Sequence, residues 1–118
     1  MLLYDGDCRL CRLAARVVAR LDRRQALGIL PFQDLRAAPY LARVPEQERF
    51  SSWHLVFPDG RRATRGELGP LLALIPATRR LVPLARRLPL ERLYELVSRR
   101  RGRLARLLPD GPAPRRAP

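Results

Sequence analysis

The chain has 118 residues and a formal net charge of +13, because 24 basic residues outnumber 11 acidic ones. This length allows one domain with a single hydrophobic core and excludes two ordinary domains. Every basic residue is arginine, and 12 of the 24 lie in residues 79–118. An arginine-rich end suggests binding to nucleic acid or to an acidic membrane surface. A compositional bias of the coding DNA also explains arginine without lysine, so nucleic-acid binding is not expected as the main function.

The apolar segments of the chain are too short to cross a membrane. The longest run without charge, Leu68 to Ala77, contains Pro70 and Pro76 and falls far short of the roughly 20 residues that a spanning helix needs. The apolar start of the chain is not preceded by a charged leader, and no export signal is expected. We therefore expect a cytoplasmic protein. In that compartment two cysteines are typically redox-active or metal-binding.

Both cysteines follow a predicted first strand, Leu2 to Tyr4, and precede a helical pattern. Apolar residues with helical spacing predict an amphipathic helix of about four turns. We expect its apolar stripe to face the core, with Cys11 just beyond the edge of the stripe and Cys8 accessible in the first turn. The stripe consists of Leu10, Leu13, Ala14, Val17, Val18 and Leu21.

This placement suits disulfide exchange. A helix N-terminus and guanidinium groups such as that of Arg9 stabilise a thiolate, so Cys8 is the expected nucleophile. Cys11, one turn later, is the expected resolving thiol. Asp5 and Asp7 act in the opposite direction, because carboxylates raise the pKa of a nearby thiol. Asp7 is also a good helix N-cap, and the sequence leaves open whether the two aspartates shape the turn or transfer a proton.

The next elements predict an α/β fold. Leu27 to Phe32 has strand length, and strand, helix and strand imply a right-handed parallel crossover. After a short helix within residues 34–49, Trp53 to Phe57 predicts a third strand that turns back into Arg61 to Thr64. A helix opened by Gly66 and Glu67 completes the order β-α-β-(α)-β-β-α. This order predicts a thioredoxin-like fold with a small central mixed sheet and flanking helices.

The remaining chain predicts a helical extension. Prolines divide it into helices over residues 79–87 and from Leu90 to about Arg106, which can pack back on the domain. We expect a domain of residues 1–108, of which about 79–108 form the extension. Residues 109–118 contain four prolines and no large apolar side chain, and they are predicted to be disordered.

The cysteine motif resembles that of the DCC family of thiol-disulfide oxidoreductases, which is named for an Asp-Cys-x-x-Cys motif near the N-terminus. The resemblance spans most of residues 1–108 and extends more loosely through Leu30-Pro31-Phe32-Gln33, the segment from His54 to Gly60, and Leu93-Tyr94. It implies a thioredoxin-like fold and thiol-disulfide oxidoreductase activity with Cys8 and Cys11 as the redox pair. The implied partner is a protein or small molecule that contains a disulfide or thiol, and no cofactor is expected.

Candidate substrate-binding residues precede the third strand. Many thioredoxin-fold enzymes have a cis-proline there, next to the cysteines, whereas residues 50–54 contain none. Either a serine, with Ser52 as our candidate, takes that position or the substrate is held differently. Trp53 is expected in the core or against the substrate, and His54 is a structural residue or a group that faces the cysteines. Arg9 is the fourth candidate.

Other functions fit the residues less well. A zinc site lacks ligands, because the chain has two cysteines and one histidine, and no metal is expected. Asp5-Gly6-Asp7 after a strand also resembles the haloacid-dehalogenase phosphotransferases, but the chain has no lysine and no later acidic pair. A thioredoxin-fold binding module with an arginine-rich surface for an acidic partner stays open as an alternative.

Overall fold

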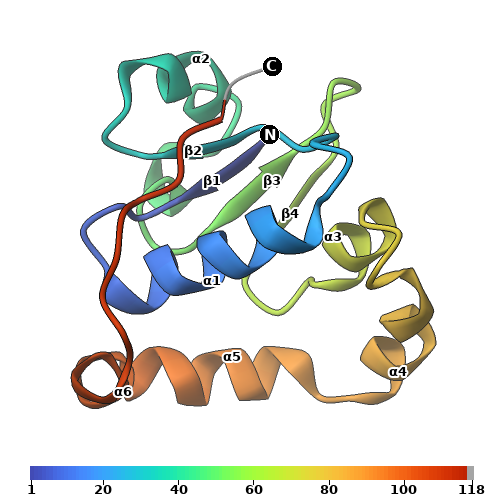
Figure 1. Ribbon diagram of the computed structural model, residues 1–118. Helices are drawn as coiled ribbons and strands as arrows, with labels where there is room; N and C mark the ends of the chain where they lie inside the picture. Colours follow the sequence, from blue (N-terminus) through green and yellow to red (C-terminus); the bar gives the residue numbers. More distant parts are fainter. Residues whose placement is uncertain (117–118) are drawn as a thin grey trace.

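A four-stranded mixed sheet lies at the centre of the computed structural model, which describes residues 1–116 (Figure 1). The strands are β1 (Leu2–Tyr4), β2 (Ile29–Pro31), β3 (His54–Val56) and β4 (Arg62–Thr64), in the order β2-β1-β3-β4. β1 is parallel to β2, and β3 is antiparallel to both β1 and β4. The predicted parallel crossover and the predicted antiparallel return are both confirmed.

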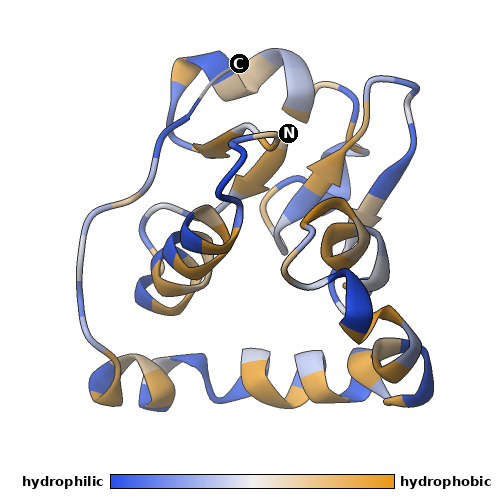
Figure 2. Cartoon of the chain, turned by 45° about the vertical axis from the view of Figure 1, so that its right-hand side comes forward, coloured by the Kyte–Doolittle hydropathy of each residue, from blue (hydrophilic) through white to orange (hydrophobic). Residues whose placement is uncertain are grey.

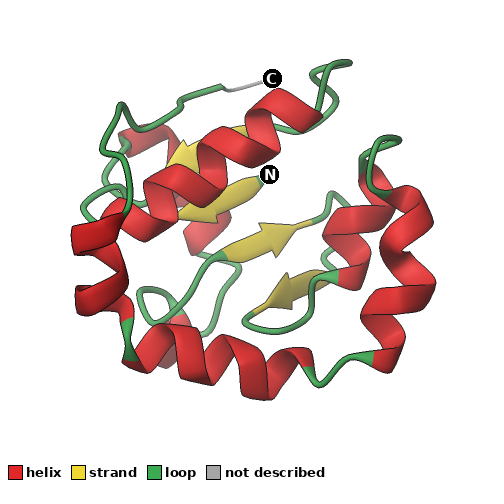
Figure 3. Ribbon diagram, turned by 60° about the horizontal axis from the view of Figure 1, so that its bottom comes forward, coloured by secondary structure: helices red, strands yellow, loops and turns green. Residues whose placement is uncertain are grey.

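The two faces of the sheet bury separate groups of side chains, because successive residues of a strand point to opposite faces. Leu2 and Tyr4 pack under α1 (Arg9–Leu21) and α3 (Gly69–Leu74), whereas Leu3 packs on the other face. That second face is covered by η1 (Leu35–Ala37) and α2 (Ala38–Leu41), and η2 (Glu46–Glu48) follows. Figure 3 shows the strands in the middle with helices around them.

The cysteine helix turns a different face to the core than its apolar stripe predicts. Ala15 is buried, and Cys11, Val18 and Ala19 pack against the core, whereas Val17 is 48% exposed. Residues with small side chains, Cys11, Ala15 and Ala19, occupy this inner face together with Val18. The predicted stripe is therefore confirmed only at its edge, where Val18 packs against the core, and Cys11 belongs to the inner face of the helix.

The helical extension consists of η3 (Arg79–Leu81), α4 (Val82–Arg87), α5 (Leu90–Arg99) and α6 (Arg101–Leu107). The predicted continuous helix from Leu90 to about Arg106 is interrupted at Arg100, where φ is −99° and ψ is 13°. Consecutive arginines repel one another, and Gly102 is a poor helix former. These two features favour a break at this position. Across the described residues, no helix is long and apolar enough to span a membrane.

Residues 109–116, here called the C-terminal strap, run along α1 and reach β2 (Figure 1). The Arg16 guanidinium donates to the carbonyls of Pro109 and Pro112, each at 3.2 Å, and the Tyr4 hydroxyl donates to that of Pro114 at 2.6 Å. This order differs from the predicted disorder of residues 109–118, of which 117 and 118 lie outside the described residues. Backbone carbonyls, rather than apolar side chains, supply most of these contacts.

The C-terminal strap ends at Arg116, which pairs with the buried carboxylate of Asp22. Arg116 exchanges two backbone hydrogen bonds with Ile29 and places its guanidinium 2.6 Å from Asp22. The Asp22 side chain is 1% exposed and also accepts the backbone N–H groups of Ala26 and Leu27. A buried carboxylate needs such partners, because losing one leaves desolvated charge unpaired.

Replacing Arg116 with Gln should lower the free energy of unfolding by about 1–3 kcal/mol, since the buried Asp22 carboxylate loses its cation. The matched control is Arg115→Gln, because Arg115 pairs with Asp34 at 3.2 Å but is itself 51% exposed. That change should cost less than about 1 kcal/mol. Urea unfolding measures both values, and equal losses would contradict the role given to Asp22.

Candidate active site

The loop between β1 and α1 is held in place by two side chains from outside it. Gln33, which follows β2, accepts the Gly6 N–H at 2.9 Å and donates to Asp5 and Asp7 at 3.1 and 3.2 Å. Arg12 donates to the Gly6 carbonyl at 2.9 Å. A Cβ at Gly6 would lie 2.8 Å from the Gln33 side chain, so this clamp requires glycine.

Cys8 caps the cysteine helix. Its backbone is extended (φ −94°, ψ 120°), and its Sγ accepts the Cys11 N–H at 3.3 Å. Asp7, considered as a possible cap, does not cap the helix: its N–H forms a turn with Asp5 Oδ1 at 2.9 Å, and its carboxylate accepts from Gln33. A helix N-terminus with a nearby backbone N–H donor is an environment that activates a cysteine sulfur as a nucleophile.

Cys11 lies in a different environment one turn later. Burial of its thiol, together with the contact to Cys8, raises the pKa of Cys11 to about 12. The Asp5 carboxylate raises it further, and the Arg101 guanidinium lowers it. Cys11 is therefore a protonated thiol near neutral pH, and it needs a proton acceptor before it can attack a disulfide.

A cavity of about 300 Å³ lies between α1, the sheet and α5, and Cys11 is part of its wall. This volume is at the lower end of the range for small-molecule sites. Most of the lining is apolar, and Asp5, Ser52, Tyr94, Ser98 and Arg101 supply its polar groups. The apolar part comes from Leu2, Tyr4, Leu10, Ala14, Ala15, Val18, Phe32, Trp53, Leu68, Leu71 and Val97.

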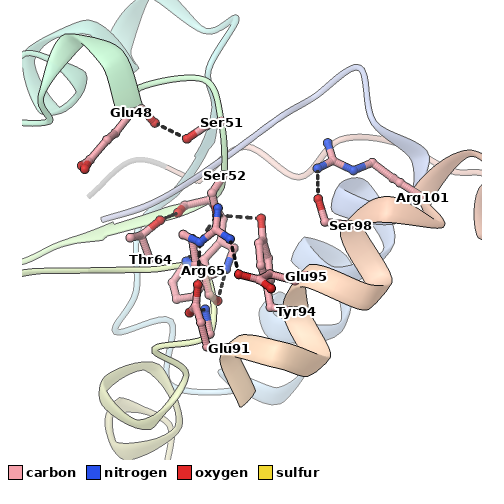
Figure 4. Close-up of polar contacts among 12 residues, drawn as sticks. Glu48, Ser51, Ser52, Thr64, Arg65, Glu91, Tyr94, Glu95, Ser98 and Arg101 are labelled. Atoms are coloured by element: carbon pink, nitrogen blue, oxygen red, sulfur yellow. Dashed lines mark hydrogen bonds and ion pairs between the residues drawn. The ribbon is translucent and has the colours of Figure 1, made fainter. Parts of the chain in front are cut away.

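Polar contacts hold α5 over this cavity (Figure 4). The Tyr94 hydroxyl donates to Ser52 Oγ at 2.7 Å. Arg65 pairs with Glu91 at 2.6 Å and with Glu95 at 3.5 Å. Glu91 also accepts the Gly66 N–H at 3.0 Å, and a Cβ at Gly66 would lie 2.6 Å from the Glu91 Cα. The start of α5 is therefore fixed against the end of β4.

The structure brings together only some of the substrate-binding candidates. Ser52 and Trp53 line the cavity with Cys11, and the Trp53 Nε1–H donates to the Arg65 carbonyl at 2.9 Å. Arg9 is engaged elsewhere, because it donates to the Ala105 carbonyl at 3.0 Å. His54 does not line the cavity.

His54 instead points into the opposite side of the sheet. It is 1% exposed, and its Nε2 lies 2.9 and 3.1 Å from the carbonyls of Glu48 and Arg49. Since both neighbours are acceptors, Nε2 carries the hydrogen. Burial lowers the pKa of His54, and the structural role considered for this histidine fits its contacts.

Four residues of the site were not among the predicted site residues, although Gln33 and Tyr94 lie in segments that carry the family resemblance. Gln33 follows β2, and parallel pairing places it beside the loop after β1, so strand order was the signal that could have identified it. Tyr94, Ser98 and Arg101 come from the helical extension. Their positions at i, i+4 and i+7 put them on one face of a helix, but the sequence alone does not indicate which element that face meets.

A mixed sheet in the order β2-β1-β3-β4, with a Cys-x-x-Cys pair at the start of the first helix, defines a thioredoxin-like protein. The predicted fold class is confirmed. A family model described as DCC1-like thiol-disulfide oxidoreductase matches residues 2–107. The chain belongs to this family, as the resemblance of the cysteine motif predicted. No curated protein and no solved structure matches the chain. Within residues 1–116, no three His, Cys, Asp or Glu side chains gather as metal ligands.

Changing Gln33 to Glu should slow the alkylation of Cys8, because a third carboxylate then lies beside Asp5 and Asp7 and two donated hydrogen bonds are lost. A nearby negative charge disfavours a thiolate, and we expect the rate at neutral pH to fall roughly two- to fivefold. The measurement is alkylation followed by intact mass, with Cys11 replaced by Ser. Gln47→Glu, which adds the same charge at an exposed position, should leave the rate unchanged; a similar decrease there would contradict the clamp.

Proposed function

We propose that this protein is a thiol-disulfide oxidoreductase in which Cys8 is the nucleophile and Cys11 the resolving thiol. One observation carries the proposal: two cysteines one turn apart lie in opposite environments. Cys8 caps the helix at its N-terminus, whereas Cys11 lies beneath it with a pKa of about 12. The DCC1-like family match supports the same reaction class.

The reaction takes place in two exchange steps. The Cys8 thiolate attacks one sulfur of a substrate disulfide, a mixed disulfide forms, and the other substrate sulfur leaves as a thiolate that takes up a proton. Cys11 then loses its proton and attacks the Cys8 sulfur. The Cys8–Cys11 disulfide forms, and the second substrate thiol is released. The substrate gains two electrons, which an external dithiol returns to the protein by the reverse exchange. The substrate is a protein or a small molecule that contains a disulfide.

We assign the proton transfer to Asp5 rather than Asp7. Asp5 lines the cavity with Cys11, and its charge acts on the Cys11 thiol. Asp7 is exposed and does not line the cavity. In this assignment the Asp5 carboxylate accepts the Cys11 proton as Cys11 attacks, and Gln33 keeps Asp5 in position.

Single cysteine variants test the assignment of the two thiols. Cys11→Ser should alkylate rapidly and accumulate a mixed disulfide with a small aromatic disulfide. Cys8→Ser should alkylate at least about tenfold more slowly near pH 7, because a thiol with a raised pKa has little thiolate, and its rate should keep rising above pH 9. Intact mass and alkylation rates between pH 6 and 10 measure both. Equal rates at neutral pH would sink the assignment.

Asp5→Asn and Asp7→Asn separate proton transfer from electrostatics. With an aromatic disulfide whose released thiolate absorbs visible light, the first release reports the attack by Cys8 and the second reports the attack by Cys11. Asp5→Asn should slow the second release by about tenfold or more, and Asp7→Asn should leave it unchanged. Without proton transfer, removing the Asp5 charge lowers the pKa of Cys11 and makes the second release faster, which would rule out this role.

A further inference from the structure

The helical extension exposes large apolar side chains on α4 and α5. Leu84 is 53% exposed, Leu93 44% and Leu96 47%. Leu93 and Leu96 are three residues apart on one side of α5, whereas Tyr94 and Ser98 contact the cavity. Leu81, Leu84 and Leu88 likewise follow one another at spacings of three and four residues, and exposed apolar residues of this kind mark interaction sites. We call these residues the leucine surface: Leu81, Leu84, Leu88, Leu93 and Leu96, each at least 44% exposed.

Arginines without an acidic partner among the described residues alternate with these leucines along the extension, apart from Arg101, which lines the cavity and donates to Ser98. Residues 79–106 contain ten arginines and only two acidic residues, Glu91 and Glu95. Both acids pair with Arg65, outside this segment. Within residues 1–116, none of the ten arginines has a carboxylate oxygen within 4.0 Å, whereas eight of the remaining arginines form ion pairs. The positive charge of this segment is therefore not neutralised within the described chain.

The combination of leucine and arginine indicates the nature of the partner. Hydrophobic and hydrophilic residues alternate along α4 and α5 (Figure 2), as in helices that lie in the plane of a membrane surface. A second copy of this surface would bring like charges together. Nucleic acid would satisfy the arginines but would leave the leucines in contact with a polar backbone. Anionic lipid suits both kinds of side chain, because its phosphate groups pair with arginine and its acyl chains contact leucine.

We propose that residues 79–106 bind the surface of a membrane that contains anionic lipids. The leucine surface enters the boundary between headgroups and acyl chains, and the surrounding arginines contact lipid phosphates. This binding does not involve the cysteines. The opposite side of α5 keeps Tyr94 and Ser98 on the cavity, so thiol chemistry and membrane binding use different sides of one helix.

Sedimentation of the full chain with lipid vesicles tests the proposal. At physiological ionic strength, affinity for vesicles of phosphatidylcholine with about one third phosphatidylglycerol should exceed that for phosphatidylcholine alone by at least about tenfold. Added salt should weaken binding to the mixed vesicles. Equal affinity for the two kinds of vesicle, or no binding to either, would overturn the proposal.

Variants locate the binding surface. L93Q/L96Q and R92Q/R99Q should each lower the affinity for the mixed vesicles by at least about tenfold. The controls are V17Q/L35Q and R23Q/R24Q, which change exposed residues of the same kinds outside the extension and should alter the affinity less than about twofold. All four variants should keep the Cys8 alkylation rate of the parent, which verifies folding.

Other results would overturn the lipid assignment. An equal loss of affinity in R23Q/R24Q and R92Q/R99Q would show that net charge alone is responsible, and an equal loss in V17Q/L35Q and L93Q/L96Q would show that the leucine surface is not the binding site. Salt-sensitive binding to a DNA fragment, unaffected by L93Q/L96Q and without vesicle binding, would assign the arginines to nucleic acid. An acidic peptide that binds while vesicles do not would assign the surface to a protein partner.

Discussion

The parallel pairing of β1 with β2 is the interaction on which the site depends. The register joins Tyr4 to Pro31, and the Phe32 N–H continues the pairing to the Tyr4 carbonyl at 2.8 Å. Parallel strands bring their carboxyl ends to the same edge of a sheet, so the segment that follows β2 lies beside the loop that leads to Cys8. The clamp by Gln33 is a consequence of this register. A shift of one residue would point the Gln33 side chain to the opposite face.

The helix that begins at this edge holds its two cysteines in different surroundings. Cys8 lies before the first turn, where backbone N–H groups have no intrahelical partner. Three residues later, Cys11 has turned toward the core, and its thiol is desolvated. No cofactor or charge cluster is needed for this difference, because the position of a residue along one helical turn determines it. Ala15, Val18 and Ala19 pack on the same core as Cys11.

The parts of the fold that the sequence predicted depend on local patterns. The positions of the strands, the cysteine helix and the turn at Gly60, where φ is +91°, follow from apolar periodicity and turn residues, although three of the strands are shorter than predicted. The orientation of α1 does not follow from its apolar periodicity, because packing against the sheet outweighs the amphipathic stripe. The contact between Arg116 and Asp22 joins residues 94 positions apart, and no local pattern encodes such a pair. The cavity likewise depends on the contact between α5 and Ser52, and only the tertiary structure determines where that contact lies.

The C-terminal strap also affects how the sheet meets other chains. The strand order leaves β2 and β4 at the two edges, and edge strands present unpaired backbone groups on which another strand can add. The two edges are protected differently. On β4, Arg62 places charge at the edge, whereas on β2 the backbone of Ile29 is already paired with Arg116 in an antiparallel bridge. The last described residue of the strap thus occupies the position that a strand of another molecule would take, so this contact limits aggregation through the β2 edge.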